Sequence, residues 1–337
     1  MKVIIYDTKP YDKPWFDRLS LEYNCEIKYL DYHLNADTAR FASGYKAVCI
    51  FVNDVADKQT LEALKENGVE LLALRCAGYN NVDLKSASDC GIKVVRVPEY
   101  SPSAVAEHGM ALLLCVNRKI HRAYSRTREN NFNINGLIGF DMREKTVGIV
   151  GTGKIGSFFA EICLGFKMKV NGYDPSPNDD FAGEYMPLER LFAESDIISL
   201  HCPLTTQTRH MVNRESISAM KDGVIIINTS RGGLIETPAL ISALKSKKVY
   251  GAGLDVYEEE ADYFFSDYSA EIITDDDLAR LLSFPNVVLT SHQAFFTEEA
   301  TREIAKTTLE SVRTFMNGET LLNEICCDNA KAPPKPE

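Results

Sequence analysis

Short apolar runs rich in valine and isoleucine recur along the chain, and helix-compatible stretches separate them. The runs are KVIIY (2–6), EIKYL (26–30), KAVCIF (46–51), VELLAL (69–74), IKVVRV (92–97), TVGIV (146–150), MKVNGY (168–173), DIISL (196–200), GVIIIN (223–228), VYGAGL (249–254) and NVVLT (286–290). Near-continuous apolar strands that alternate with helices are typical of parallel sheets covered by helices on both faces. The pattern therefore predicts an α/β fold built on parallel sheets.

A change of pattern near residue 100 divides this series. The segment SPSAVAEHGMALLLCVNRKIHRAYSRTREN (101–130) starts with Ser-Pro and has apolar residues at helical spacing, which predicts one long helix. A last helical stretch, residues 297–318, opens with a Thr-x-x-Glu-like cap, ends at Gly318 and could pack back on the first domain. Since 337 residues suit two domains, we predict two Rossmann-like domains: residues 1–100 with 299–337, discontinuous in sequence, and residues 101–298.

A glycine-rich motif follows the run TVGIV directly. In GTGKIG, Gly151, Gly153 and Gly156 have the G-x-G-x-x-G spacing, and the helix-compatible stretch SFFAEICLGF comes next. The first glycine permits a tight turn, the second lets the backbone approach a pyrophosphate, and the third allows close packing of helix and strand. Backbone N–H groups at the helix start would then face the phosphates. The motif predicts a dinucleotide site.

An acidic residue ends the next strand. Asp174, in NGYDP, lies eighteen residues beyond Gly156, where a dinucleotide fold places a carboxylate that binds the adenosine ribose. Such a carboxylate would repel a 2′-phosphate, which favours NAD over NADP. An aspartate before a proline is also common in turns, so the alternative that Asp174 only forms a turn stays open.

Polar residues follow three later strands. Arg231 comes after GVIIIN, Asp255 and the glutamates 258–260 come after VYGAGL, and His292 comes after NVVLT. Ligands gather beyond the carboxyl ends of parallel strands, and reduction of a 2-keto acid needs a cation for the carboxylate and an acid for the carbonyl oxygen. The planar guanidinium group of arginine matches the geometry of a carboxylate, and histidine is a natural proton donor because its unperturbed pKa lies near neutrality. Two alternatives remain open. Arg231 could bond loop carbonyl oxygens, and the glutamates 258–260 could be a solvated acidic run.

Other candidates have weaker context. His201 also follows a strand, but its continuation CPLTTQT indicates a loop against the cofactor, and His108 lies within the long helix. His33, His121 and His210 have no supporting motif. A covalent role for Cys202 or Cys76 would need a basic partner, which the sequence does not show.

Seven segments carry a family resemblance: LRCAGYNNVD (74–83), VPEYSPSAVAEH (97–108), GIVGTGKIG (148–156), LHCPLT (200–205), NTSRGGLI (228–235), LDVYEEE (254–260) and SHQAFFTEEA (291–300). The chain resembles the NAD-dependent D-2-hydroxyacid dehydrogenases, and most of all the fermentative D-lactate dehydrogenases among them. The resemblance implies that Arg231 binds the substrate carboxylate, that His292 donates and accepts the proton, and that Glu260 pairs with it.

The resemblance also implies the binding residues. Cofactor contacts would come from Gly151, Gly153, Lys154, Ile155, Gly156, Asp174, Cys202, Pro203, Thr229, Ser230 and Asp255, the last on the nicotinamide carboxamide. Substrate contacts would come from Gly78, Tyr100, Arg231, His292 and Phe295, with Phe51 as a further wall residue. Residues 1–100 and 299–337 would form the substrate domain, and residues 101–298 the NAD domain.

The activity implied is reversible, NADH-dependent reduction of pyruvate to D-lactate. Bulkier 2-keto acids such as phenylpyruvate are an alternative substrate class, and an NADH-sensing corepressor is an alternative role. Relatives assemble as dimers or larger oligomers through the cofactor domain, so a homodimer or homotetramer is expected, with the long helix in the contact.

Composition narrows the partners and the compartment. A net charge of -11 argues against a nucleic-acid partner. No stretch approaches the roughly 18 apolar residues of a membrane helix, and MKVIIYDTK is expected to be a first strand, not a signal peptide. Nine cysteines without C-x-x-C spacing suggest reduced thiols in a cytoplasmic protein. No metal site is predicted.

Overall fold

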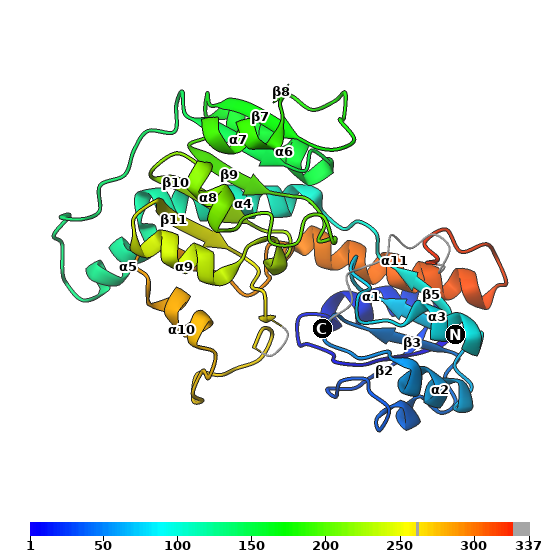
Figure 1. Ribbon diagram of the computed structural model, residues 1–337. Helices are drawn as coiled ribbons and strands as arrows, with labels where there is room; N and C mark the ends of the chain where they lie inside the picture. The colour runs from blue at the N-terminus through cyan, green and yellow to red at the C-terminus, as the bar shows by residue number, and fades with distance from the viewer. Residues whose placement is uncertain (261–262, 326–337) are drawn as a thin grey trace. The chain divides into compact units, whose positions relative to one another are not determined.

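The computed structural model describes residues 1–260 and 263–325. The chain divides into two compact units, one comprising Met1–Ser101 and the segment that begins at Phe296, the other comprising Pro102–Phe295. Cys326, Cys327 and the end of the predicted first domain lie outside the described residues. Figure 1 shows a parallel sheet in each unit, which confirms the predicted α/β class.

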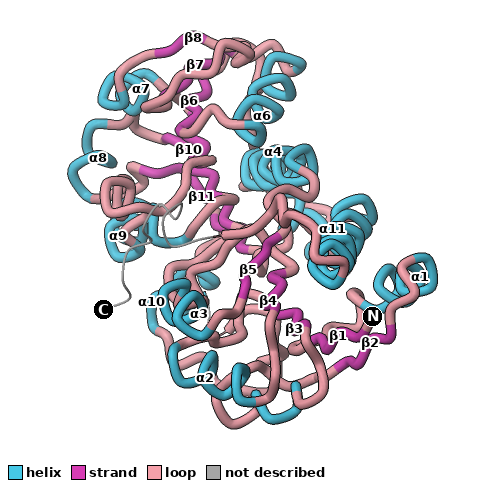
Figure 2. Tube along the Cα trace, turned by 90° about the vertical axis from the view of Figure 1, so that its right-hand side faces the viewer, coloured by secondary structure: helices cyan, strands magenta, loops and turns pink. Residues whose placement is uncertain are grey.

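The first unit is built on a parallel sheet with the order β2-β1-β3-β4-β5. Its strands are β1 (Lys2–Ile5), β2 (Glu26–Tyr29), β3 (Ala47–Ile50), β4 (Leu71–Leu74) and β5 (Lys93–Arg96), and its helices are α1 (Lys13–Glu22), α2 (Lys58–Glu66), α3 (Leu84–Cys90) and α11 (Glu298–Met316), with the 3₁₀ turn η1 (Ala39–Ala42). Figure 2 shows α1 and α11 on one face of the sheet and α2 and α3 on the other. This order is that of flavodoxin-like folds.

Helix α11 joins the first unit although it is distant in sequence. Its residues Ala305, Leu309 and Val312 are fully buried in the core that also contains Phe16 of α1. The Thr297 side chain caps the helix by accepting a hydrogen bond from the amide of Ala300. Because position N3 is alanine, the glutamate half of the expected Thr-x-x-Glu cap is missing, so that part of the prediction is wrong.

The second unit contains a parallel sheet with the order β12-β11-β10-β9-β6-β7-β8. Its strands are β6 (Thr146–Val150), β7 (Lys169–Tyr173), β8 (Glu184–Tyr185), β9 (Ile197–Leu200), β10 (Val224–Asn228), β11 (Val249–Leu254) and β12 (Val287–Leu289). Strand β8, which pairs with β7, was not predicted because two residues carry no periodicity. The order changes direction between β6 and β9, as in dinucleotide-binding folds.

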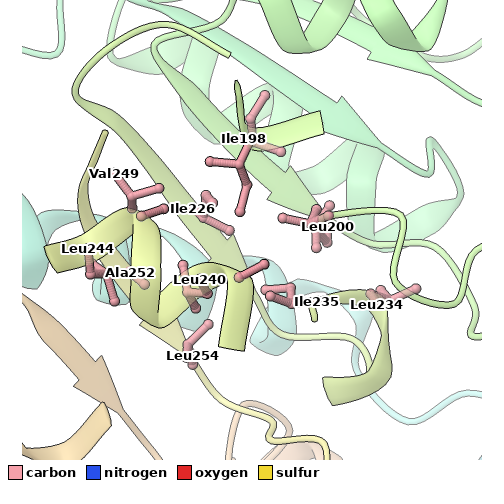
Figure 3. Close-up of a cluster of buried hydrophobic side chains, with 14 of the residues drawn as sticks. Ile198, Leu200, Ile226, Leu234, Ile235, Leu240, Leu244, Val249, Ala252 and Leu254 are labelled. Carbon is pink, nitrogen blue, oxygen red and sulfur yellow. The ribbon is translucent and has the colours of Figure 1, made fainter. Parts of the chain in front are cut away.

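Helices cover both faces of this second sheet. They are α4 (Pro102–Arg118), α5 (Ile120–Arg128), α6 (Lys154–Gly165), α7 (Leu188–Glu194), α8 (Arg214–Ala219), α9 (Thr237–Lys245) and α10 (Asp276–Ser283), with the 3₁₀ turn η2 (Gly232–Leu234). Helices α4 and α6 pack in one core. Figure 3 shows the other core, where Ile198, Ile226 and Ala252 of neighbouring strands meet Leu240 and Leu244 of α9. Burial on both faces explains the unbroken apolar runs.

One long helix was predicted for residues 101–130, and the structure instead has two. Lys119, between α4 and α5, has a left-handed backbone with φ 52°. Its Nζ donates to the carbonyl oxygen of Ile138 at 2.6 Å and to the hydroxyl of Tyr250 at 2.5 Å. These distant partners anchor the lysine in the turn, and helical periodicity cannot reveal them.

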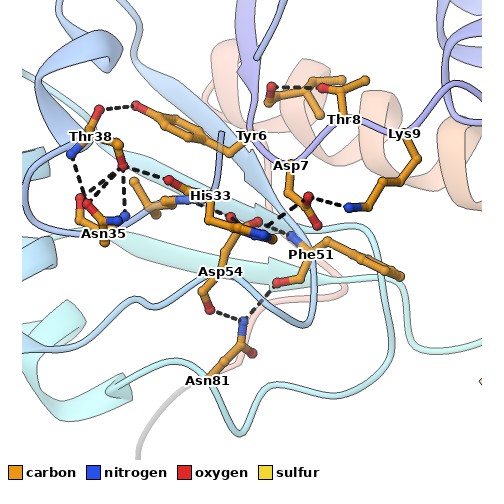
Figure 4. A network of polar contacts seen from close by, with 12 residues as sticks. Tyr6, Asp7, Thr8, Lys9, His33, Asn35, Thr38, Phe51, Asp54 and Asn81 are labelled. Atoms are coloured by element: carbon orange, nitrogen blue, oxygen red, sulfur yellow. Dashed lines mark hydrogen bonds and ion pairs between the residues drawn. The ribbon is translucent and has the colours of Figure 1, made fainter. Parts of the chain in front are cut away.

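A buried polar network lies at the carboxyl ends of β1 and β3 (Figure 4). The Asp54 carboxylate is fully buried and accepts hydrogen bonds from the amides of Leu34 and Phe51, both at 2.6 Å. Burial raises its pKa to about 6. The Asn81 side-chain amide donates to the carbonyl oxygens of Phe51 and Asp54. The network therefore fixes the loop after β3 against the loop after β4.

Within the described residues, no helix combines the length and the hydrophobicity that crossing a bilayer requires.

Candidate active site

The glycine-rich turn connects β6 to α6 in a way that requires glycine. Gly151 has φ 92°, and a Cβ atom there would lie 2.6 Å from the amide nitrogen of Cys202. A Cβ on Gly156 would lie 2.0 Å from the carbonyl oxygen of Gly151, closer than any real contact. Larger residues at these two positions would therefore force the turn, the helix and the loop after β9 apart.

The second glycine of the motif, Gly153, faces open space. Gly153 is the N-cap of α6, and no atom lies within 4 Å of the position that its Cβ would take. The N-terminal N–H groups of a helix favour anions. A crowded turn beside an open helix start fits a dinucleotide pyrophosphate, which Gly153, Lys154 and Ile155 would hold.

Asp174 follows β7 and is bonded to the glycine-rich turn. One carboxylate oxygen accepts from the amide of Thr152 at 2.9 Å, and the other accepts from the amide of Ser176 at 2.9 Å. The side chain is partly exposed, and each oxygen has a further lone pair for a ribose hydroxyl. Tyr185 of β8, which the sequence gave no reason to select, bonds the Thr152 hydroxyl at 2.7 Å.

The loops after β9 and β10 are also bonded to each other. The Ser230 hydroxyl donates to the carbonyl oxygen of Cys202 at 2.6 Å. Within the described residues, the buried hydroxyl of Thr229 has no hydrogen-bond partner, so a ligand at this edge could provide one. Burial raises the pKa of Cys202 to about 12, which excludes a thiolate nucleophile there.

Residues after three adjacent strands, β10, β11 and β12, provide the polar groups predicted for chemistry. The Nδ1 atom of His292 lies 2.8 Å from Oε1 of Glu260, and about a quarter of each side chain is exposed. The other oxygen of Glu260 accepts from the amide of Tyr257 at 3.0 Å. Glu259 is exposed. Of the three glutamates, Glu260 is therefore the one that contacts His292.

His292 lies in a strained turn that Asp255 holds. Its φ is 51°, a left-handed conformation that is uncommon for residues other than glycine. The fully buried Asp255 carboxylate accepts from the amides of Gln293 at 2.9 Å and Ala294 at 2.7 Å, and from the Thr290 hydroxyl at 2.5 Å. The backbone of Asp255 accepts from the His292 amide at 2.7 Å. The sequence suggested only a cofactor contact for Asp255 and gave no indication of this support.

Arg231 leaves β10 through a loop packed on the loop after β11. Its Nη1 donates to the neighbouring carbonyl oxygen of Ser230 at 2.7 Å, so the loop-carbonyl alternative describes part of its bonding. The side-chain amide of Asn228 donates to the main-chain carbonyl oxygen of Arg231 at 2.8 Å. A Cβ on Gly232 would lie 2.1 Å from the backbone of Tyr257. The loops that carry Arg231 and Glu260 are therefore in direct contact.

The competing histidines have other environments. Burial lowers the pKa of His201 to about 3, so this ring is neutral and cannot be a proton donor near neutral pH. His108 of α4 places Nε2 3.0 Å from the Thr290 hydroxyl and 3.4 Å from Oδ1 of Asp255. His108 therefore belongs to the support behind the His292 turn.

The remaining residues of interest are aromatic side chains and loop residues. The Phe265 ring lies 6.1 Å from the His292 ring, centroid to centroid. Sequence reasoning missed it, although the aromatic pair at 264–265 follows the glutamate run closely. Phe295 is buried in the second unit, whereas Gly78, Tyr100 and Phe51 belong to the first unit. The sulfur of Cys76 lies 3.2 Å from the carbonyl oxygen of Gly78.

Comparison with known proteins shows which proteins the whole chain is similar to. Residues 110–294 match the family described as D-isomer specific 2-hydroxyacid dehydrogenase, NAD binding domain. The D-lactate dehydrogenase of Escherichia coli (strain K12) is 48% identical over 328 residues, which cover 96% of this chain and 100% of that protein. A solved structure of the pyruvate reductase of Chlamydomonas reinhardtii is 42% identical, with a TM-score of 0.92 and coverage of 96% and 98%. The structure of D-lactate dehydrogenase with NAD+ from Lactobacillus jensenii is 31% identical, with a TM-score of 0.83 and coverage of 96% and 99%.

Proposed function

This chain belongs to the D-isomer specific 2-hydroxyacid dehydrogenase family and is an NAD-dependent enzyme, and from that premise we propose that it reduces pyruvate to D-lactate with NADH. The observation that carries the proposal is the 2.8 Å contact between His292 and Glu260, beside the loop of Arg231. These residues supply an acid, its counter-charge and a carboxylate receptor at one sheet edge. The pyruvate reductase from Chlamydomonas reinhardtii, with its TM-score of 0.92, supports the choice of substrate.

In the proposed reaction, C2 of pyruvate gains a hydride and its carbonyl oxygen gains a proton. The bound cofactor supplies the hydride. Arg231 binds the substrate carboxylate through two parallel hydrogen bonds. His292 donates the proton from Nε2, because its Nδ1 is bonded to Glu260. The negative charge of Glu260 stabilises the protonated ring before transfer, and neutral His292 accepts the hydroxyl proton of lactate in the reverse direction.

The remaining predicted residues have supporting roles in this proposal. Residues 101–298 bind NAD, and residues 1–100 with 299–337 form the substrate domain. The backbone of Gly78 binds the carboxylate, while Tyr100 and Phe295 contact the methyl group, with Phe51 as a further wall. Asp255 contacts the nicotinamide carboxamide in addition to holding the His292 turn.

Turnover measurements test the substrate. Loss of NADH absorbance with millimolar pyruvate is expected, and chiral chromatography should find D-lactate alone. A higher kcat/KM for phenylpyruvate than for pyruvate would favour the alternative of an enzyme for bulkier 2-keto acids. The comparison is informative because a misfitting methylene changes substrate discrimination by roughly 1–3 kcal/mol. NADH binding without turnover of any 2-keto acid would instead favour the corepressor role.

We also propose a homodimer that forms through the cofactor domain. Helix α5 and the following loop expose large apolar side chains, including Phe132 at 74% and Ile138 at 83%. Exposed apolar clusters of this kind are typical of protein interfaces. Light scattering should find a dimer for the wild type and a monomer for F132E/I138E, and a monomeric wild type would refute the assembly.

A cytoplasmic location is the last part of the proposal. The cysteines in the described residues, Cys25 to Cys202, are all free thiols, as a reducing compartment would maintain them. Fractionation of cells that express the tagged chain should recover it in the cytoplasmic fraction.

A further inference from the structure

A second histidine–glutamate pair lies next to the first. The Nε2 atom of His210 lies 2.5 Å from Oε1 of Glu258, and both side chains are partly buried, at 34% and 19% exposed. The Thr237 hydroxyl, at the start of α9, donates to Oε2 of Glu258 at 3.4 Å. Arg209 Nη2 lies 4.0 Å from Oε1. Because an ionised carboxylate can only accept, His210 donates the hydrogen bond.

This pair connects three loops at the carboxyl edge of the sheet. The amide of His210, in the loop after β9, donates to the carbonyl oxygen of Gly233 at 2.9 Å. Gly233 follows Arg231 in the loop after β10. Glu258 is in the loop after β11, where a Cβ on Gly232 would lie 2.4 Å from its amide nitrogen. Bonds of Glu258 therefore restrain the loop after β11 against the loop after β9 and the start of α9, which follows β10.

The same short loop presents Glu260. Glu258 and Glu260 are two residues apart and point to different histidines, His210 and His292 respectively. The amide of Tyr257, the residue before Glu258, donates to Glu260 and sets the direction of its carboxylate. A shift of the backbone at Glu258 would therefore move the Glu260 oxygen that contacts His292.

We propose that His210 and Glu258 are positioning residues that hold Glu260 against His292. This inference rests on the proposed function, in which Glu260 stabilises the protonated ring. Neither side chain needs to touch the substrate for this role. Misplacement of a catalytic group by about 1 Å can cost roughly 100-fold in rate, so a pair remote from the reacting atoms can still control kcat.

Four variants separate the hydrogen bond from the charge. E258A and H210A remove the contact, whereas E258Q and H210Q keep a hydrogen-bonding amide at the same place. We expect the alanine variants to lower kcat for pyruvate by roughly 10- to 100-fold, with KM changed less than kcat, and the amide variants to recover most of the loss. The matched control is E194A, which breaks the exposed Arg190–Glu194 pair on α7 and should leave kcat unchanged.

The decisive test places E258A in the background of E260Q. If Glu258 acts through Glu260, E258A should lower kcat much less in that background than in the wild type, because coupled residues are not additive. An equal loss in both backgrounds would overturn the proposal, as would wild-type kcat in both alanine variants. Comparable thermal stability of E258Q and E258A would show that the difference between them is not one of folding.

A measurement without substrate keeps this inference separate from the proposed function. Hydrogen exchange of the Tyr257 amide, read by mass spectrometry of peptide 254–260, should be at least about 10-fold faster in E258A than in E194A. Unchanged exchange would refute the positioning role even in an active enzyme. Faster exchange in a protein that does not reduce pyruvate would refute only the substrate proposed above.

Discussion

The acid stability of the second unit should depend on one histidine, His201, which is partly buried. The His201 ring bonds Ser199 through Nε2 at 2.8 Å, lies 5.0 Å from the ring of Phe159, and has a buried Nδ1 without a partner in the described structure. Burial disfavours the charged ring and lowers its pKa to about 3. His201 should therefore remain neutral in the folded protein at pH 5.

The size of the effect follows from the difference between the folded and unfolded chains. In the unfolded chain, histidine has a pKa of about 6.5, so below that pH only the unfolded state gains this proton. The contribution of His201 is therefore fully present above pH 6.5 and is lost as the pH falls. From pH 7 to pH 5 the free energy of unfolding should drop by about 2 kcal/mol through this group alone.

Two measurements check this expectation. Ring resonances of labelled protein should show that His201 does not titrate between pH 7.5 and pH 5. Denaturant unfolding of H201Q should show a loss between pH 7 and pH 5 that is about 2 kcal/mol smaller than in the wild type. H121Q, which replaces the partly exposed His121 on α5, serves as the control. A His201 midpoint near pH 6, or the same pH dependence in H201Q and wild type, would refute the reasoning and reopen His201 as a proton donor.

Four substitutions test the rest of the site. Glu260→Gln keeps the bond to His292 but removes the charge, so kcat for pyruvate reduction should fall by about 10-fold or more; an unchanged kcat would contradict this. Arg231→Lys loses the two-pronged contact and should lower kcat/KM by roughly 10- to 100-fold, whereas unchanged kinetics would remove it from the site. Asp174→Ala should narrow the preference for NADH over NADPH by about 10-fold, and a preserved ratio would mean that another residue binds the ribose. Gly156→Ala, whose Cβ would lie 2.0 Å from the Gly151 oxygen, should destabilise the protein by about 1–3 kcal/mol in thermal unfolding and weaken NADH binding, and wild-type values would show that the turn can relax.

The strands and the glycine-rich turn could be predicted because their causes are local. Residues buried on both faces of a sheet must be apolar in sequence, and the turn before α6 needs glycine at fixed spacing. Lys119 could not be predicted as a helix break, since its partners Ile138 and Tyr250 are distant in sequence. The two-residue strand β8 has no pattern of its own and forms only because β7 offers a paired edge.

The roles of the three glutamates 258–260 could not be predicted from the local sequence either. The sequence YEEE does not distinguish them, and only the family resemblance favoured Glu260. In the folded chain Glu258 meets His210, Glu259 is exposed and Glu260 meets His292. Which glutamate faces which histidine depends on the path of the loop, and that path depends on contacts with the loops after β9 and β10.

These contacts also explain why a parallel sheet alone does not make the site. Neighbouring strands lie about 4.8 Å apart. The sheet alone therefore places the loops after β10, β11 and β12 side by side only to within a few ångströms. Catalytic groups must be held to within about 0.5 Å. Here the finer placement comes from a buried aspartate. The Asp255 carboxylate accepts from the amides of Gln293 and Ala294, and its main-chain carbonyl oxygen accepts from the amide of His292. Charged groups behind the reacting ones therefore provide the precision, and their partners cannot be identified until the chain is folded.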